Sequence, residues 1–271
     1  MPPPALVRHA RARLSIDVTR QADLVFSVAA STEYGEVNES ISLTSDDQEI
    51  ALEEVVTSSG SRLHRARHTP PGRVQLSYEA TIQAAAPASP SPPIDEIIYT
   101  RPSRYCDSDR LANLAHTHFA GLEGFELMGA VNQWVRTRVR YTPGDSRVVD
   151  GALEVYLSRR GVCRDSAHLV ITFLRALNMP ARLASVYAPG LTPMDFHAVA
   201  EAYWEGRWYL LDATGLAPRP AMARICTGRD ASDTAFMTTL AGHTNLVGMQ
   251  VDAWTEGDLP YDDKFSFVTL N

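Results

Sequence analysis

Cys163, His197 and Asp212 are residues of types that together could perform nucleophilic catalysis. A cysteine attacks a carbonyl carbon as its thiolate, and the free N–H groups and dipole of a helix N-terminus stabilise that anion. We expect a helix to begin at or just after Cys163, whose backbone N–H could then help to hold an oxyanion. A nucleophile of this kind also needs a base, and the base needs an acceptor that fixes its tautomer. His197 is the candidate base and Asp212 the candidate acceptor.

The segments HAVAEAYW and WYLLDAT predict a β-hairpin that carries His197 and Asp212. If residues 205–206 form a two-residue loop, Trp204 pairs with Arg207. His197 and Asp212 then lie on one face of the hairpin as diagonal neighbours, within reach of a hydrogen bond. A shift of the register by one residue would separate them. The pairing of the two side chains therefore depends on the loop length.

The helix that carries Cys163 has apolar residues nearly all round, which predicts a central, buried element that ends at Asn178 and Pro180. The spacing of apolar residues predicts an earlier helix that opens near Gly124. A short helix between them is expected to take Asp150 as its N-cap. The segment ARLASVYA then predicts a strand before the hairpin.

The N-terminal third of the chain has a different pattern. From Arg13 to Gln83, short β-rich pieces alternate apolar and polar residues, as in antiparallel sheets. The run AAAPASPSPP, residues 84–93, is rich in proline and poor in residues that could form a core, which indicates a linker. The predicted fold class is α+β, with a β-rich domain over residues 1–93 and a second domain over residues 94–271.

Composition excludes several classes of partner. The net charge of -7 gives no basic surface for nucleic acid or for an anionic membrane. The short basic run within residues 62–73 is interpreted as a solvated hairpin turn. No calcium-loop or phosphate-loop motif is present, so we expect no cofactor and no metal. The oligomeric state stays open.

The expected location is the cytoplasm. No stretch approaches the roughly 20 apolar residues that cross a bilayer, and the start of the chain lacks the apolar region of a signal peptide. Three widely spaced cysteines argue against a disulfide framework and fit a reducing compartment. Of these, Cys106 and Cys226 are expected to be inert packing or surface thiols.

The stretch RRGVCRDSAHLVITFLRALNMPARLASVY, followed by FHAVAEAYWEGRWYLLDAT, resembles the core of microbial transglutaminase-like proteins. Residues 161–165, His197 and Asp212 occupy the matching positions. The segments RPSRYCDSDRL and TGRDASDTAF extend the resemblance, and the β-rich N-terminal region suits the domain that accompanies this family. The chain has Val199 where the family usually has Trp and Ala213 where it usually has Pro.

This resemblance implies a papain-like domain in which a central helix packs on an antiparallel sheet. It further implies that Cys163 attacks an amide or ester carbonyl, His197 shuttles the proton and Asp212 orients His197. The substrate would be a peptide, a protein or a small amide, and either water or an amine would resolve the acyl-enzyme. The alternative is a catalytically silent scaffold that binds a peptide or protein partner in the same cleft.

Other polar and aromatic residues near the motif have simpler interpretations. His168 is expected to be a hydrogen-bonded core histidine, since its position on the helix points away from Cys163. Arg164 and Asp165 are left outside the catalytic set because an acidic residue is favourable at any helix start. Packing is the expected role of Trp204 and Trp208. The segment with Arg229, Asp230 and Asp233 is interpreted as an ion-paired loop.

Overall fold

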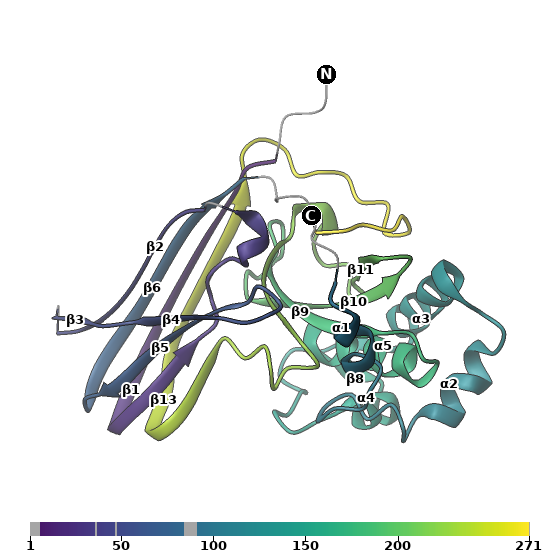
Figure 1. The fold of residues 1–271 in the computed structure, drawn as a ribbon, viewed down its shortest axis with the longest axis horizontal. Helices are drawn as coiled ribbons and strands as arrows, with labels where there is room; N and C mark the ends of the chain where they lie inside the picture. The colour runs from purple at the N-terminus through teal and green to yellow at the C-terminus, as the bar shows by residue number, and fades with distance from the viewer. Residues whose placement is uncertain (1–5, 36, 47, 84–90, 271) are drawn as a thin grey trace.

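A computed structural model describes residues 6–35, 37–46, 48–83 and 91–270. It shows a large β-sheet region on one side and, on the other, helices gathered around a smaller sheet (Figure 1). Within the described residues, no helix is long and apolar enough to cross a membrane.

The large sheet has the strand order β3-β2-β6-β1-β5-β4. Strands β6 and β5 pair with successive parts of one edge of β1, and β13 pairs with the opposite edge. Apolar side chains alternate with exposed ones along β1 and β6, and the buried set forms one hydrophobic core. This confirms the predicted antiparallel β structure. The strands are β1 (Arg8–Phe26), β2 (Asn38–Ser45), β3 (Gln48–Ile50), β4 (Glu53–Val56), β5 (Arg62–Thr69), β6 (Gly72–Ile82) and β13 (Met237–Thr255), with a 3-10 helix η1 (Thr32–Tyr34).

One strand of this sheet comes from the far end of the sequence. The sequence predicts that residues 94–271 form the second domain, but β13 pairs with β1 along its full length, from Arg8↔Thr255 to Phe26↔Met237. The reason is that β5 and β6 cover only one side of β1, which leaves a second row of N–H and C=O groups to be paired. The N-terminal region is therefore completed by a C-terminal strand.

The basic run lies on the β5–β6 hairpin, but most of its residues belong to strand β5 and only residues 70–71 form the turn, so the interpretation as a solvated turn is correct only in part. Its arginines are neutralised by carboxylates of the same region, at N–O distances that include 2.8 Å for Arg65–Asp23 and 3.0 Å for Arg67–Glu53. Arg62 pairs with Glu39 at 2.6 Å. This surface therefore has its charges paired internally.

The second region contains a four-stranded antiparallel sheet in the order β11-β10-β9-β12, against which α5 packs through β9 and β10. The elements are α1 (Pro93–Ile98), α2 (Ala112–Phe119), α3 (Gly124–Arg138), β7 (Arg140–Tyr141), α4 (Ala152–Ser158), β8 (Arg160–Gly161), α5 (Cys163–Ala176), β9 (Ala181–Tyr187), β10 (His197–Trp204), β11 (Arg207–Leu211), η2 (Arg219–Ala221) and β12 (Ala223–Gly228).

The predicted helices are present, with two differences. Gly151, not Asp150, caps α4: the Gly151 N–H donates to Glu154 Oε2 at 2.9 Å, while Asp150 pairs with Arg147. The predicted linker falls mostly on residues 84–90, which lie outside the described residues. Its last residue, Pro93, already begins α1, where the missing N–H of proline does no harm.

Candidate active site

Cys163 is the first residue of α5, as the sequence predicts, and it is partly exposed. The Cys163 N–H precedes the first intrahelical hydrogen bond, which runs from the Ser166 N–H to the Val162 carbonyl at 3.1 Å. No acceptor for the Cys163 N–H lies among the described residues. The thiol therefore stands beside a free donor at the positive end of a helix whose remaining turns are buried.

Asp165 fixes the approach to this helix. Its Oδ2 accepts a hydrogen bond of 2.8 Å from the Val162 N–H. Gly161 passes so close that a Cβ atom there would lie 2.6 Å from the Asp165 Cβ, so only glycine fits. The backbone on either side of Cys163 is thereby held by one buried carboxylate.

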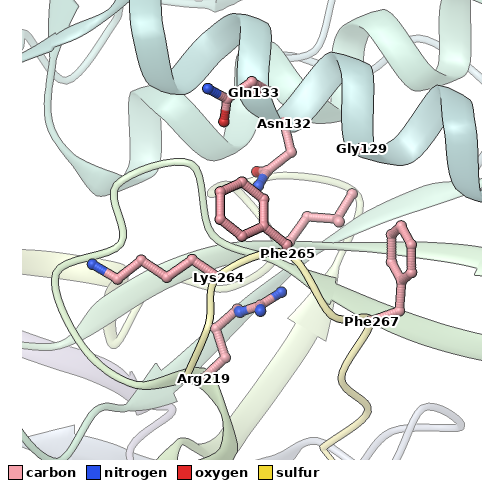
Figure 2. A pocket seen from close by; sticks show the side chains of 8 residues that line it. Gly129, Asn132, Gln133, Arg219, Lys264, Phe265 and Phe267 are labelled. Carbon is pink, nitrogen blue, oxygen red and sulfur yellow. The ribbon is translucent and has the colours of Figure 1, made fainter. Parts of the chain in front are cut away.

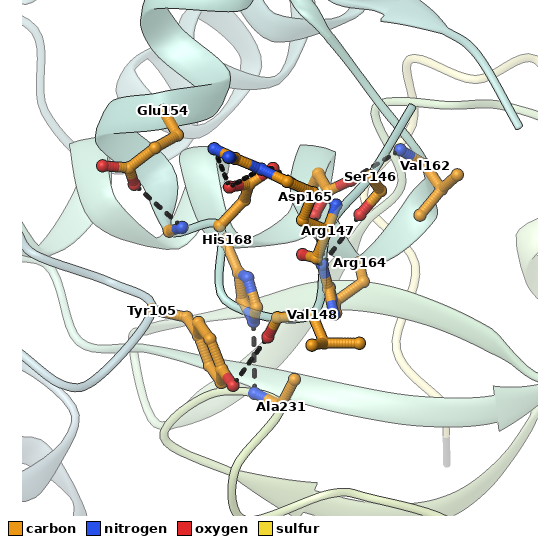
Figure 3. A network of polar contacts seen from close by, with 12 residues as sticks. Tyr105, Ser146, Arg147, Val148, Glu154, Val162, Arg164, Asp165, His168 and Ala231 are labelled. Carbon is orange, nitrogen blue, oxygen red and sulfur yellow. Dashed lines mark hydrogen bonds and ion pairs between the residues drawn. The ribbon is translucent and has the colours of Figure 1, made fainter. Parts of the chain in front are cut away.

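Arg164 ties the loop after β7 to the same carboxylate (Figure 3). It donates to Asp165 Oδ1 at 3.0 Å, to Ser146 Oγ at 2.8 Å and to the Arg147 carbonyl at 2.8 Å. These contacts give Arg164 and Asp165 a positioning role at the helix start, so leaving them out of the catalytic set is consistent with the structure.

The predicted register of the hairpin is confirmed. Trp204 pairs with Arg207, and Glu205 and Gly206 form the loop in left-handed conformations with φ of 47° and 83°. As that register requires, His197 Nε2 lies 3.1 Å from Asp212 Oδ2. Both side chains are 1% exposed.

Asp212 is held in place by its second oxygen. Oδ1 accepts hydrogen bonds from the Thr214 N–H at 2.8 Å and from the Thr214 hydroxyl at 2.6 Å. Burial alone would raise the pKa of Asp212, but its interaction with His197 and these hydrogen bonds outweigh burial and lower the pKa from its ordinary value. The carboxylate is therefore charged and points at His197.

The pKa of His197 shifts in the opposite direction to that of Asp212. Burial acts to lower the pKa of His197, but the charge and hydrogen bond of Asp212, together with the Cys163 side chain, raise it to about 10. Because Nε2 faces Asp212, the other ring nitrogen, Nδ1, is the one available to Cys163. The ring therefore lies between the buried carboxylate and the helix start.

The remaining cysteines have no comparable surroundings. Cys106 and Cys226 are buried, and burial raises the pKa of Cys106 to about 12 and that of Cys226 to about 11. Cys226 lies in the hydrophobic core shared with the large sheet. All three thiols are free, and Cys163 is the one that solvent reaches.

His168 of α5 contacts the segments RPSRYCDSDRL and TGRDASDTAF, which are part of the same sequence resemblance. Burial lowers the pKa of His168 to about 3, so the ring is neutral, and its Nε2 accepts from the Ala231 N–H at 3.1 Å. The ring stacks on Tyr105, as Figure 3 shows. Asp230 accepts from the Tyr105 N–H at 2.9 Å, and Arg229 pairs with Asp233 at 2.8 Å. The prediction of a core histidine is therefore confirmed.

The two tryptophans of the hairpin are used in packing. Trp204 covers Gly124, where a Cβ would come within 2.8 Å of the indole. The Trp208 indole N–H donates to Ser91 Oγ at 2.6 Å. The Arg182 guanidinium lies over the Trp208 ring, with its Cζ 4.0 Å from the ring centre. Both side chains are therefore engaged within the protein, in agreement with the sequence interpretation.

Tyr141 is a neighbour of the site that the sequence analysis missed. In the short parallel pair β7–β8 it lies opposite Gly161, two residues before Cys163. Burial raises the pKa of Tyr141, and the nearby charge of Cys163 raises it further. Its side chain is 41% exposed. A strand of two residues gives no periodic signal, so only the fold shows that Tyr141 lies beside the residues that precede Cys163.

A metal site is not apparent here. Within the part of the chain that the structure describes, no three His, Cys, Asp or Glu side chains gather as metal ligands.

Comparisons with known proteins identify the family of this chain. Residues 120–213, which include Cys163, His197 and Asp212, match the family model of the transglutaminase-like superfamily. The crystal structure of a protein from Cytophaga hutchinsonii named "Putative Cysteine Protease" is 32% identical, covers 96% of this chain and 95% of that chain, and superposes with a TM-score of 0.84. An uncharacterized protein of Mycobacterium leprae is 32% identical over 115 residues, which span 39% of this chain and 41% of that protein. The chain belongs to the transglutaminase-like superfamily.

Proposed function

We propose that this protein is a cysteine-nucleophile enzyme that forms an acyl-enzyme at Cys163 from a peptide, a protein or a small amide. The observation that carries the proposal is the buried hydrogen bond between His197 and Asp212, beside a thiol at the start of a helix. The name of the Cytophaga hutchinsonii relative supports chemistry of the protease or amidase type.

In the first half-reaction, the Cys163 thiolate attacks the carbonyl carbon and forms a C–S bond while the carbonyl oxygen takes the negative charge. His197 gives the proton on Nδ1 to the departing amine as the C–N bond breaks. Asp212 keeps the ring oriented and stabilises its charged form. The acyl group is then held as a thioester on Cys163.

In the second half-reaction, His197 takes a proton from water or from an amine, which attacks the thioester carbonyl. The C–S bond breaks, and the thiolate is restored. Water gives hydrolysis and an amine gives acyl transfer, and the competition between them depends on which nucleophile reaches the cleft.

Two donors are available for the oxyanion in this proposal. The Cys163 N–H is free at the helix start, and Tyr141 pairs with Gly161 in β7–β8, near enough for Cys163 to raise the pKa of its phenol. Donors of this kind stabilise charge that develops only in the transition state. We therefore assign Tyr141 as the second oxyanion donor.

A cytoplasmic location is part of the same proposal. The mechanism needs a reduced Cys163, and this cysteine is the thiol that solvent reaches. A reducing compartment would keep it in the reactive form.

The direct test is a screen of peptide, ester and amide acyl donors with and without added amine, in which ammonia release and amine incorporation are both measured. We expect turnover by the wild type and by Cys106→Ala, and none by Cys163→Ala with the same circular dichroism spectrum. Equal turnover by Cys163→Ala and the wild type would refute the proposal.

A further inference from the structure

A concave site lies between α3, the end of β11 and the C-terminal segment (Figure 2), and Cys163, His197 and Asp212 are not among the residues that line it. Its volume is about 190 Å³. It is lined by Gly129, Asn132, Gln133, Leu211, Arg219, Lys264, Phe265 and Phe267. The set contains two cations and no carboxylate.

One polar group in this pocket is buried without a partner. Asn132 is 8% exposed, and its Oδ1 has no hydrogen-bond partner among the described residues. Figure 2 shows the Asn132 side chain directed from α3 towards Phe265. A buried acceptor that lacks a donor is unfavourable by roughly 1–3 kcal/mol, so a ligand that donates to it gains this stabilisation.

The two cations differ in their pairing. Arg219 is 4% exposed and is neutralised by Asp262, with N–O distances of 3.0 and 2.7 Å. Lys264 Nζ donates to the Gly215 carbonyl at 2.9 Å, and it forms no ion pair with the residues that the structure describes. Arg219 also has Asp263 at 3.8 Å, so Lys264 is the cation of the lining that forms no direct ion pair with the described residues.

Apolar side chains complete the lining. Phe265 is 76% exposed, while Phe267 packs on Phe125 with ring centres 4.7 Å apart. Leu211 is buried and immediately precedes Asp212. The exposed ring of Phe265 over a pocket with Leu211 in its lining suits a branched apolar group.

From these contacts we infer that the pocket binds a small carboxylic acid that carries one negative charge, a hydroxyl donor and an apolar side chain. The carboxylate is received by Lys264, the hydroxyl donates to Asn132 Oδ1 and the apolar group contacts Phe265. The site is separate from the triad and does not depend on the activity proposed for Cys163.

Lys264 is the only lysine of the chain, which permits a selective measurement. Reductive ¹³C-methylation keeps the charge of the amine and gives a single lysine side-chain signal in the NMR spectrum. The probe is 2-hydroxy-4-methylpentanoate, titrated against this signal. Two comparison compounds each change one group: 4-methylpentanoate lacks the hydroxyl, and 2-hydroxy-4-methylpentanamide lacks the charge.

We expect a saturable shift of the Lys264 signal with the hydroxy acid and binding at least about tenfold weaker for each comparison compound. Calorimetry on unmethylated protein should show the same loss for Lys264→Met and Asn132→Leu but not for Arg110→Met, which removes an exposed cation elsewhere. Absence of a saturable shift, equal binding of the amide, or unchanged binding by Lys264→Met would overturn the inference.

Discussion

The His197–Asp212 pair is almost closed to water, and this determines how its charge depends on pH. A carboxylate whose pKa falls on folding and an imidazole whose pKa rises on folding each stabilise the folded state in the charged form. The same charge state is the one that the proposed mechanism needs for proton transfer to the leaving amine.

The sign of the effect on stability follows from the two shifts. The Asp212 contribution is present above its ordinary pKa of 3.8 and is lost as the pH falls through the lower value of the folded state. The His197 contribution is complete below its ordinary pKa of 6.5 and is lost as the pH rises towards about 10. The pair therefore stabilises the fold most between about pH 4 and pH 6.5.

We predict that the free energy of unfolding of the wild type decreases between pH 6.5 and pH 10 by a few kcal/mol, since each unit of pKa shift is worth about 1.4 kcal/mol. In Asp212→Asn the free energy of unfolding should decrease much less over this pH range, because His197 no longer has a charged partner. Urea unfolding at several pH values measures both slopes. Equal slopes in the two proteins would contradict this account of the pair.

At the scale of elements, the hairpin was predictable because its loop has a strong local signal. Glu205-Gly206 fixes the pairing of Trp204 with Arg207, and side-chain alternation then places His197 and Asp212 on one face. The start of α5 was predictable for a similar reason, since Gly161 and the apolar run after Cys163 are adjacent in sequence.

Elements that depend on long-range pairing were not predictable in this way. β7 and β8 have two residues each, so their parallel pairing, and the place of Tyr141, appear only in the fold. β13 is mostly exposed and pairs with a strand more than 200 residues away, so no local pattern assigns it to the large sheet. The N-cap of α4 is Gly151 and not the predicted Asp150, because Asp150 forms an ion pair with Arg147.

We predict that Tyr141→Phe lowers kcat for acyl-enzyme formation by about a hundredfold with little change in KM, since its hydroxyl acts on the transition state. Steady-state kinetics on an acyl donor from the screen provides the measurement. Tyr261→Phe is the matched control, because Tyr261 is 88% exposed in the C-terminal segment. An unchanged kcat in Tyr141→Phe would remove the phenol from the mechanism.

At the scale of the whole molecule, buried polar contacts join the two regions at β12. Arg224 forms ion pairs with Glu201 of β10 and with Glu33 of η1. The Arg224 N–H donates to the Tyr34 hydroxyl at 2.7 Å, and the Ser31 N–H donates to the Arg224 carbonyl at 3.0 Å. The large sheet is therefore anchored to the sheet that bears His197.

We predict that Arg224→Met destabilises the protein by about 3–5 kcal/mol, because it removes one of the two arginines paired with the buried Glu201 carboxylate and the cation of the partly exposed Glu33. Arg73→Met, which removes an exposed arginine paired with Asp17, should change stability by less than about 1 kcal/mol. Urea unfolding followed by circular dichroism compares them. A loss in Arg224→Met no greater than in Arg73→Met would show that this junction is not important for stability.

The central claim is that His197 and Asp212 activate Cys163, and it can be tested without knowledge of the substrate. The measurement is the rate of iodoacetamide labelling at each cysteine, followed by peptide mass spectrometry in the wild type and in His197→Ala. We predict that Cys163 is labelled far faster than the buried Cys106 and Cys226, and at least about tenfold more slowly in His197→Ala than in the wild type. Equal labelling of the three cysteines, or the same Cys163 rate in both proteins, would contradict the account.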